Sequence, residues 1–188
     1  MKILKFFTFG LLSASGALAI ELILVALISI LFNINIENNY FNSITAFLIV
    51  AIILEEFFKL SLLRQLFFTT NEKSVKIYLA LIFGSGFAFL EIFSKLIAIP
   101  QATLLTVFSW NFFGVFLIHV LTAGVLGCFL ARKNGASLAL AAQALLLASF
   151  LHLGYNLLII YDQGAIATNT YLMTISIGLY LFKNKLAR

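Results

Sequence analysis

Charged and imidazole side chains occur inside apolar runs that would otherwise suit the interior of a membrane. The stretch AIILEEFFKLSLLR, at residues 51–64, contains Glu55, Glu56 and Lys59. A carboxylate can activate water and a nearby cation can keep it ionised, which are two requirements of hydrolysis. Because an ionisable group at membrane depth is energetically costly, these three residues predict a functional site.

Three further apolar runs each carry polar groups at helical spacing. Glu91 and Phe87 are four residues apart in GFAFLE, and His152 and Asn156 are four apart in LHLGYN. His119 lies within FLIHVLTAGVLG. Residues four apart lie on one face of a helix, so each run can present its polar groups to one interior site. Lys95 follows Glu91 by four residues, and we expect the two to form an ion pair.

The composition identifies the solvent in which these groups must work. Hydrophobic residues make up 63% of the 188 residues and charged residues 10%, and the mean hydropathy is +1.11. A soluble domain is only about half apolar. The sequence therefore predicts an all-α, polytopic membrane protein formed as a single bundle over residues 1–188, with no room for a soluble domain.

Six apolar segments are long enough to cross about 30 Å of hydrocarbon as helices. We expect them at residues 6–32, 41–68, 75–99, 103–131, 136–161 and 166–183. The connections expected on one side, NINIENNYFN, PQAT and YDQGAIATN, contain no Lys or Arg, whereas the other side carries the cations. By the positive-inside rule, both termini are expected to be cytoplasmic.

The remaining features of the chain exclude several classes of protein. The net charge of +5 comes from short cationic clusters between apolar runs, which is typical of loops that face anionic lipid, and no nucleic-acid partner is expected. The single Cys128 cannot form an intramolecular disulfide. The amino-terminal run resembles a signal peptide but continues without a polar break, so we expect an uncleaved first helix.

Counting from the ends of the expected spans places the polar groups at a common depth. If consecutive helices run antiparallel, Glu55, Glu56, Glu91, His119 and His152 all fall in the middle third of the bundle. Small residues at four-residue spacing are expected to let helices pack closely. These are Ala80, Gly84 and Ala88 in one segment and Ala123, Gly127 and Ala131 in another.

Four of these motifs, in this order, resemble the PrsW-type intramembrane proteases. The motifs are EEFFK, GSGFAFLE, FLIHVLTAGVLG and HLGYN, and the resemblance covers about residues 50–160. That family lies within the wider superfamily of CAAX prenyl endopeptidases and bacteriocin-processing proteins. The CAAX branch has Arg one position later than Lys59 and a histidine in place of Glu91, so both departures favour the PrsW branch. The resemblance implies that the glutamates of the first motif are catalytic.

The residues leave two mechanisms open for peptide hydrolysis. Glu55 or Glu56 is the candidate base, with Lys59 as its partner. In the first mechanism, His119 and His152 bind a divalent metal such as Zn²⁺ together with a carboxylate, Glu56 or Glu91. In the second mechanism no metal takes part, and the histidines orient water and stabilise the oxyanion together with Asn156.

The expected function is therefore that of an intramembrane endopeptidase acting on a membrane-anchored protein or peptide. The expected location is the cytoplasmic membrane of a bacterium or archaeon. Two alternatives stay open at this stage. One is a non-catalytic scaffold or immunity protein of the same superfamily, and the other is a proton-coupled transporter, because chains of Glu and His also relay protons. The sequence does not indicate the substrate, the cleavage site or the oligomeric state.

Overall fold

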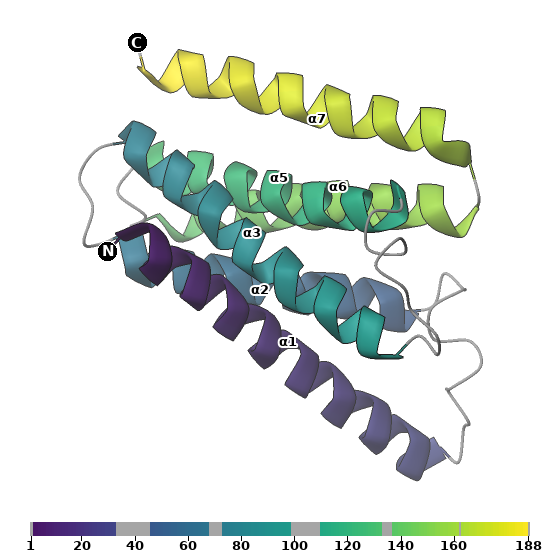
Figure 1. Cartoon of the computed structure of the whole chain (residues 1–188). Helices are drawn as coiled ribbons and strands as arrows, with labels where there is room; N and C mark the ends of the chain where they lie inside the picture. The colour runs from purple at the N-terminus through teal and green to yellow at the C-terminus, as the bar shows by residue number, and fades with distance from the viewer. Residues whose placement is uncertain are drawn as a thin grey trace.

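The chain folds into a bundle of long helices that run back and forth (Figure 1). The computed structural model describes residues 2–32, 46–67, 73–98, 110–132, 137–161 and 163–187. Within these ranges there are six helices: α1 (Lys2–Phe32), α2 (Ala46–Phe67), α3 (Lys73–Ala98), α5 (Trp110–Arg132), α6 (Leu138–Ile160) and α7 (Gly164–Ala187). The predicted all-α membrane fold is confirmed.

Five of these helices, all except α2, are long and apolar enough to cross a membrane by themselves. Helix α2 has 22 residues, so it extends about 33 Å at the usual rise per residue. It differs from the others because Glu55, Glu56 and Lys59 lie close together within it. The same three charges that mark α2 as a candidate site thus lower its hydropathy.

Helix α3 is central, since it packs against α1 and against α5 (Figure 1). Helix α7 packs on α5 and α6. The start of α1 and the end of α7 lie on the same side of the bundle (Figure 1), as six antiparallel spans require. The expected connections NINIENNYFN (33–42) and PQAT (100–103) lie outside the described residues. The third expected connection, YDQGAIATN, is shorter than predicted, because α7 already begins at Gly164.

Glycines allow α3 to approach both of its neighbours closely. A Cβ atom added at Gly84 would lie 2.7 Å from the carbonyl oxygen of His119, and one added at Gly127 would lie 2.5 Å from Cβ of Ala80. The small-residue stripes of α3 and α5 therefore pack against each other, as predicted. On the other side of α3, a Cβ added at Gly86 would lie 2.1 Å from the carbonyl oxygen of Phe7. The first of these contacts fixes α5, and with it His119, against α3.

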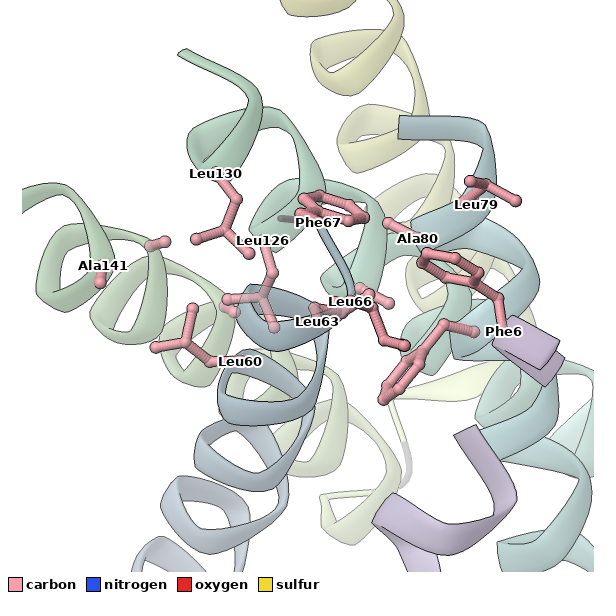
Figure 2. Close-up of a cluster of buried hydrophobic side chains, with 14 residues drawn as sticks. Phe6, Leu60, Leu63, Leu66, Phe67, Leu79, Ala80, Leu126, Leu130 and Ala141 are labelled. Atoms are coloured by element: carbon pink, nitrogen blue, oxygen red, sulfur yellow. The ribbon is translucent and has the colours of Figure 1, made fainter. Parts of the chain in front are cut away.

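An apolar cluster fills one end of the bundle (Figure 2). Its side chains come from α1, α2, α3, α5 and α6, and include Phe6, Leu63, Phe83, Leu126 and Ala144. Leu63 follows Lys59 by one turn of α2. The cluster therefore excludes water from the end of the bundle towards which α2 runs. Many outward-facing apolar side chains are exposed, including Leu22 and Leu31 on α1, as expected for a surface in contact with lipid.

Candidate functional site

Lys59 lies at the centre of a buried polar cluster formed by α2, α3, α5 and α6. Its side chain is completely buried. Nζ donates to Oε1 of Glu56 at 2.7 Å, to Oγ1 of Thr122 at 3.2 Å, and lies 2.8 Å from Nδ1 of His119. An ammonium group has three N–H donors and no acceptor. The three neighbours therefore satisfy the whole ammonium group.

Glu56 is the acceptor that joins α2 to α5 and α6. Its side chain is 0% exposed. Besides Lys59, Oε1 accepts a hydrogen bond from Oγ1 of Thr122 at 3.1 Å and lies 2.9 Å from Nδ1 of His152. An ionised carboxylate only accepts hydrogen bonds, so Nδ1 of His152 carries the proton that points to it. Glu56 therefore orients three side chains from three helices.

Glu55 occupies a different environment although it is adjacent in the sequence. Its side chain is 17% exposed, and Oε2 lies 3.7 Å from Nδ1 of His152. Among the described residues, Oε2 has no hydrogen-bond partner although the atom itself is buried. The sequence allowed Lys59 to pair with either glutamate, and in the structure it pairs with Glu56. Glu55 thus retains a carboxylate oxygen that can interact with water or with another ligand.

Helix α3 contributes Glu91, which links the buried cluster to the surface. Oε2 of Glu91 contacts Nε2 of His119, and Oε1 accepts from Nζ of Lys95 at 2.5 Å. The predicted pair of Glu91 and Lys95 is thus present. One turn earlier on α3, the ring of Phe87 lies 4.4 Å from Nζ of Lys59 and 4.9 Å from the ring of His119. Phe87 provides an aromatic surface for both side chains.

The two histidines meet at the interface of α5 and α6. Their ring centroids are 4.8 Å apart and the rings are nearly perpendicular. Asn156 is part-buried on α6, one turn after His152, and within the described part of the chain no hydrogen bond joins its amide to the glutamates. The structure therefore brings Glu55, Glu56, Lys59, Glu91, His119 and His152 into one cluster, and it leaves Asn156 beside the cluster.

Two residues that were not among the predicted site residues belong to or border the cluster. Thr122 bonds to both Lys59 and Glu56, and its position three residues after His119 on the same helix face was a usable signal. Glu21 of α1 lies within electrostatic range of Glu55, Glu91 and Lys95. Oε1 of Glu21 is buried and has no hydrogen-bond partner among the described residues. Helix α1 therefore also borders the cluster.

The exposure of the cluster increases in one direction. Glu56, Lys59 and His119 are 0% exposed, whereas Glu91 is 18% and Lys95 is 39% exposed. The completely buried residues lie next to the apolar cluster of Figure 2, which contains Leu60 and Leu63. The accessible side of the site is therefore the side of Glu55, Glu91 and Lys95.

Three residues form a group that is suitable in type for a metal ion. Glu55, His119 and His152 each offer a ligand atom, and these atoms lie within 4.8 Å of one another. Two histidines with one glutamate are a known ligand set of catalytic zinc. The sequence had predicted Glu56 or Glu91 as the carboxylate ligand, whereas this group contains Glu55. The carboxylates of Glu56 and Glu91 contact other side chains.

The hydrogen bonds of this group fit a metal ion only in part. A neutral His152 that donates from Nδ1 to Glu56 keeps a lone pair on Nε2, and a carboxylate partner of this kind is typical behind metal-bound histidines. Nδ1 of His119 instead faces the ammonium group of Lys59. Because an ammonium cannot accept a hydrogen bond, a neutral His119 carries its proton on Nε2 and has no lone pair there. In this arrangement His119 does not fit as a ligand.

Comparison with known families gives one match that covers almost the whole chain. Residues 2–182 match the model of the family described as PrsW family intramembrane metalloprotease. The match includes all six described helices except the last residues of α7. No curated protein and no solved structure matches the chain.

Proposed function

The chain belongs to the PrsW family of intramembrane metalloproteases, and on this premise we propose that it hydrolyses a peptide bond of a membrane-associated protein at the cluster around Lys59. The observation that carries the proposal is the contrast between two adjacent glutamates. Oε1 of Glu56 accepts from Lys59 and Thr122 and lies 2.9 Å from Nδ1 of His152, whereas Oε2 of Glu55 lies 3.7 Å from Nδ1 of His152 and has no hydrogen-bond partner among the described residues. Glu55 is therefore the glutamate that is less engaged by other side chains.

Glu55 is the base that activates water in this proposal. Its side chain is partly exposed, which places the carboxyl group, though not its buried Oε2, at the accessible side of the cluster. The free oxygen of Glu55 lies near the ring of His152, which can hold the same water molecule. General-base catalysis by a positioned carboxylate accelerates a reaction by about 10²–10⁴-fold.

Glu56 and Lys59 position the reacting groups and do not touch the substrate in this proposal. Both are completely buried and bonded to each other, and between them they contact both histidines. A catalytic geometry requires side chains whose orientations are fixed by their neighbours. The ion pair thus accounts for the charges at the centre of α2.

The proposed reaction needs no group beyond these side chains and water. Glu55 takes a proton from water, and the resulting hydroxide attacks the carbonyl carbon of the scissile peptide. The carbonyl oxygen becomes an oxyanion, which His119 and Asn156 stabilise by hydrogen bonds. When the C–N bond breaks, the leaving amine takes the proton from Glu55, and the products are a carboxylic acid and an amine.

The substrate is expected to approach from the lipid-exposed side. Glu91 and Lys95 border the accessible side of the cluster, and the apolar cluster of Figure 2 blocks the opposite end. A peptide that enters the site must leave its own helical hydrogen bonds, because a helix shields its backbone carbonyls from attack. We therefore propose a membrane-anchored protein or peptide that becomes extended near the membrane surface.

A zinc-assisted form of the same hydrolysis is the second candidate. The family description and the group of Glu55, His119 and His152 favour it. Bound zinc would lower the pKa of water and polarise the peptide carbonyl. Chelation followed by addition of zinc tests this form, because the metal-free reaction predicts equal cleavage in both conditions.

The experiment that tests the proposal is cleavage of membrane-anchored peptides by purified protein in lipid vesicles. Wild type is compared with Glu55→Gln and with Ser176→Ala, a control whose hydroxyl bonds only within α7. Cleavage by wild type and the control, with loss in Glu55→Gln, is the expected result. Equal cleavage by Glu55→Gln would contradict the assignment of the base, and a folded wild type that cleaves no peptide of a broad panel would contradict hydrolysis.

A further inference from the structure

We infer that Lys59 and Glu56 hold the two histidines in opposite proton arrangements, so that His119 is a hydrogen-bond donor and His152 an acceptor at the reacting side of the cluster. This inference rests on the proposed function for its catalytic meaning. The arrangement itself follows from which atoms face each other. His119 and His152 thus have different tasks, although the sequence predicted the same role for both.

His119 has a different neighbour at each of its two ring nitrogens. Nδ1 lies 2.8 Å from Nζ of Lys59, and Nε2 contacts Oε2 of Glu91. A neutral imidazole carries one proton. Because the ammonium of Lys59 can only donate a hydrogen bond, Nδ1 must offer it a lone pair. The proton is therefore on Nε2, which faces the carboxylate of Glu91. Both neighbours favour the same tautomer.

Nδ1 of His152 has carboxylate neighbours, in contrast to Nδ1 of His119, which faces an ammonium group. Nδ1 lies 2.9 Å from Oε1 of Glu56 and 3.7 Å from Oε2 of Glu55. Both neighbours are carboxylates and accept hydrogen bonds. The proton of neutral His152 is therefore on Nδ1, and Nε2 keeps its lone pair. At Nε2, the ring of His119 thus carries an N–H, whereas the adjacent ring of His152 carries a lone pair.

Several groups around Lys59 keep its ammonium in place. The ammonium has three acceptors, in Glu56, His119 and Thr122. Nζ of Lys59 also lies 4.4 Å from the centroid of the Phe87 ring. A cation over an aromatic face is attracted to it, most strongly where water is excluded. Lys59 is therefore fixed as a donor toward His119, which makes it a positioning residue.

The opposite tautomers match the two needs of peptide hydrolysis. Nε2–H of His119 can donate to the carbonyl oxygen of the substrate in place of Glu91 and so stabilise the oxyanion. Nε2 of His152 can accept a hydrogen bond from the water that Glu55 deprotonates. A metal ion at His119 would require the proton to move to Nδ1, toward the ammonium of Lys59. The arrangement therefore disfavours a metal ion bound through His119.

The test is ¹⁵N NMR of protein labelled only at histidine, since the sequence contains two histidines. The ¹⁵N shifts distinguish a protonated ring nitrogen from one with a lone pair, and His152→Gln assigns the remaining signals to His119. We expect Nε2–H for His119 and Nδ1–H for His152, with His119 unchanged by one equivalent of Zn²⁺. A proton on Nδ1 of His119, with or without zinc, would overturn the inference. This readout requires no cleavage, so its failure is distinct from failure of the proposed function.

A second measurement compares zinc affinities by competition with a coloured chelator. Lys59→Met removes the donor to His119, and we expect its affinity for zinc to be about tenfold or more above that of wild type. Ser176→Ala is the control, because the hydroxyl of Ser176 bonds to the Leu172 carbonyl within α7, and its zinc affinity should equal that of wild type. Equal affinities of Lys59→Met and wild type would contradict the role of Lys59.

Discussion

The two adjacent glutamates of α2 should respond to the same substitution in opposite ways. Glu56→Gln removes the charge that compensates the completely buried ammonium of Lys59, 2.7 Å away. Breaking one partner out of a buried ion pair costs about 3–5 kcal/mol. The free energy of unfolding should therefore fall by about that amount. Glu55→Gln should leave this free energy unchanged or slightly higher, because the affected oxygen has no described hydrogen-bond partner.

The assay is reversible unfolding of both variants in the same lipid and detergent mixture, followed by cleavage under conditions where each variant is folded. For Glu55→Gln we expect a decrease in kcat of about 10²–10⁴-fold at full stability. The reasoning would be refuted if Glu55→Gln were the less stable variant, or if Glu56→Gln unfolded like wild type.

Three further predictions follow from packing and surface contacts. Gly84→Leu should lower the free energy of unfolding by about 1–3 kcal/mol, because its Cβ would meet the His119 carbonyl; Gly178→Ala, with nothing within 4 Å, is the control and should match wild type. Lys95→Gln should change stability by less than about 1 kcal/mol, since Lys95 is 39% exposed; a larger loss in the same unfolding assay would contradict this. Thr122→Val should cost about 1.5–3 kcal/mol, and unchanged stability would contradict its bond to Glu56.

The helices and the convergence of the site could be predicted from the sequence for simple physical reasons. Long apolar runs must form helices in a membrane because their backbone groups have no other partner. Antiparallel connection then places Glu56, Glu91 and His152 at one depth. The small-residue stripe around Gly84 also indicated correctly which face of α3 packs closely.

The pairing inside the cluster could not be predicted in the same way. Lys59 is four residues after Glu55 and three after Glu56, and both spacings allow an ion pair on a helix. The rotation of α2 against α5 and α6 decides between them, and that rotation depends on the packing of side chains such as Leu63. Thr122 was missed because threonine is common in membrane helices and carries no charge.

The close crossing of α1 and α3 could not be predicted from the sequence either. It depends on Gly10 and Gly86, where an added Cβ would lie 2.0 and 2.1 Å from carbonyl oxygens of the opposite helix. These two glycines do not belong to the repeated small-residue stripes. A single glycine in an apolar run does not indicate its partner, so the sequence left the position of Glu21 relative to the site open.

The most direct test of the central claim is cleavage of a membrane-anchored peptide in water enriched in ¹⁸O, followed by mass spectrometry of the products. Hydrolysis by activated water predicts one ¹⁸O atom in the new carboxyl terminus with the wild-type protein, and almost no product with Glu55→Gln. Product formation by Glu55→Gln at the wild-type rate, or an intact peptide with folded wild type across a broad panel, would contradict the account.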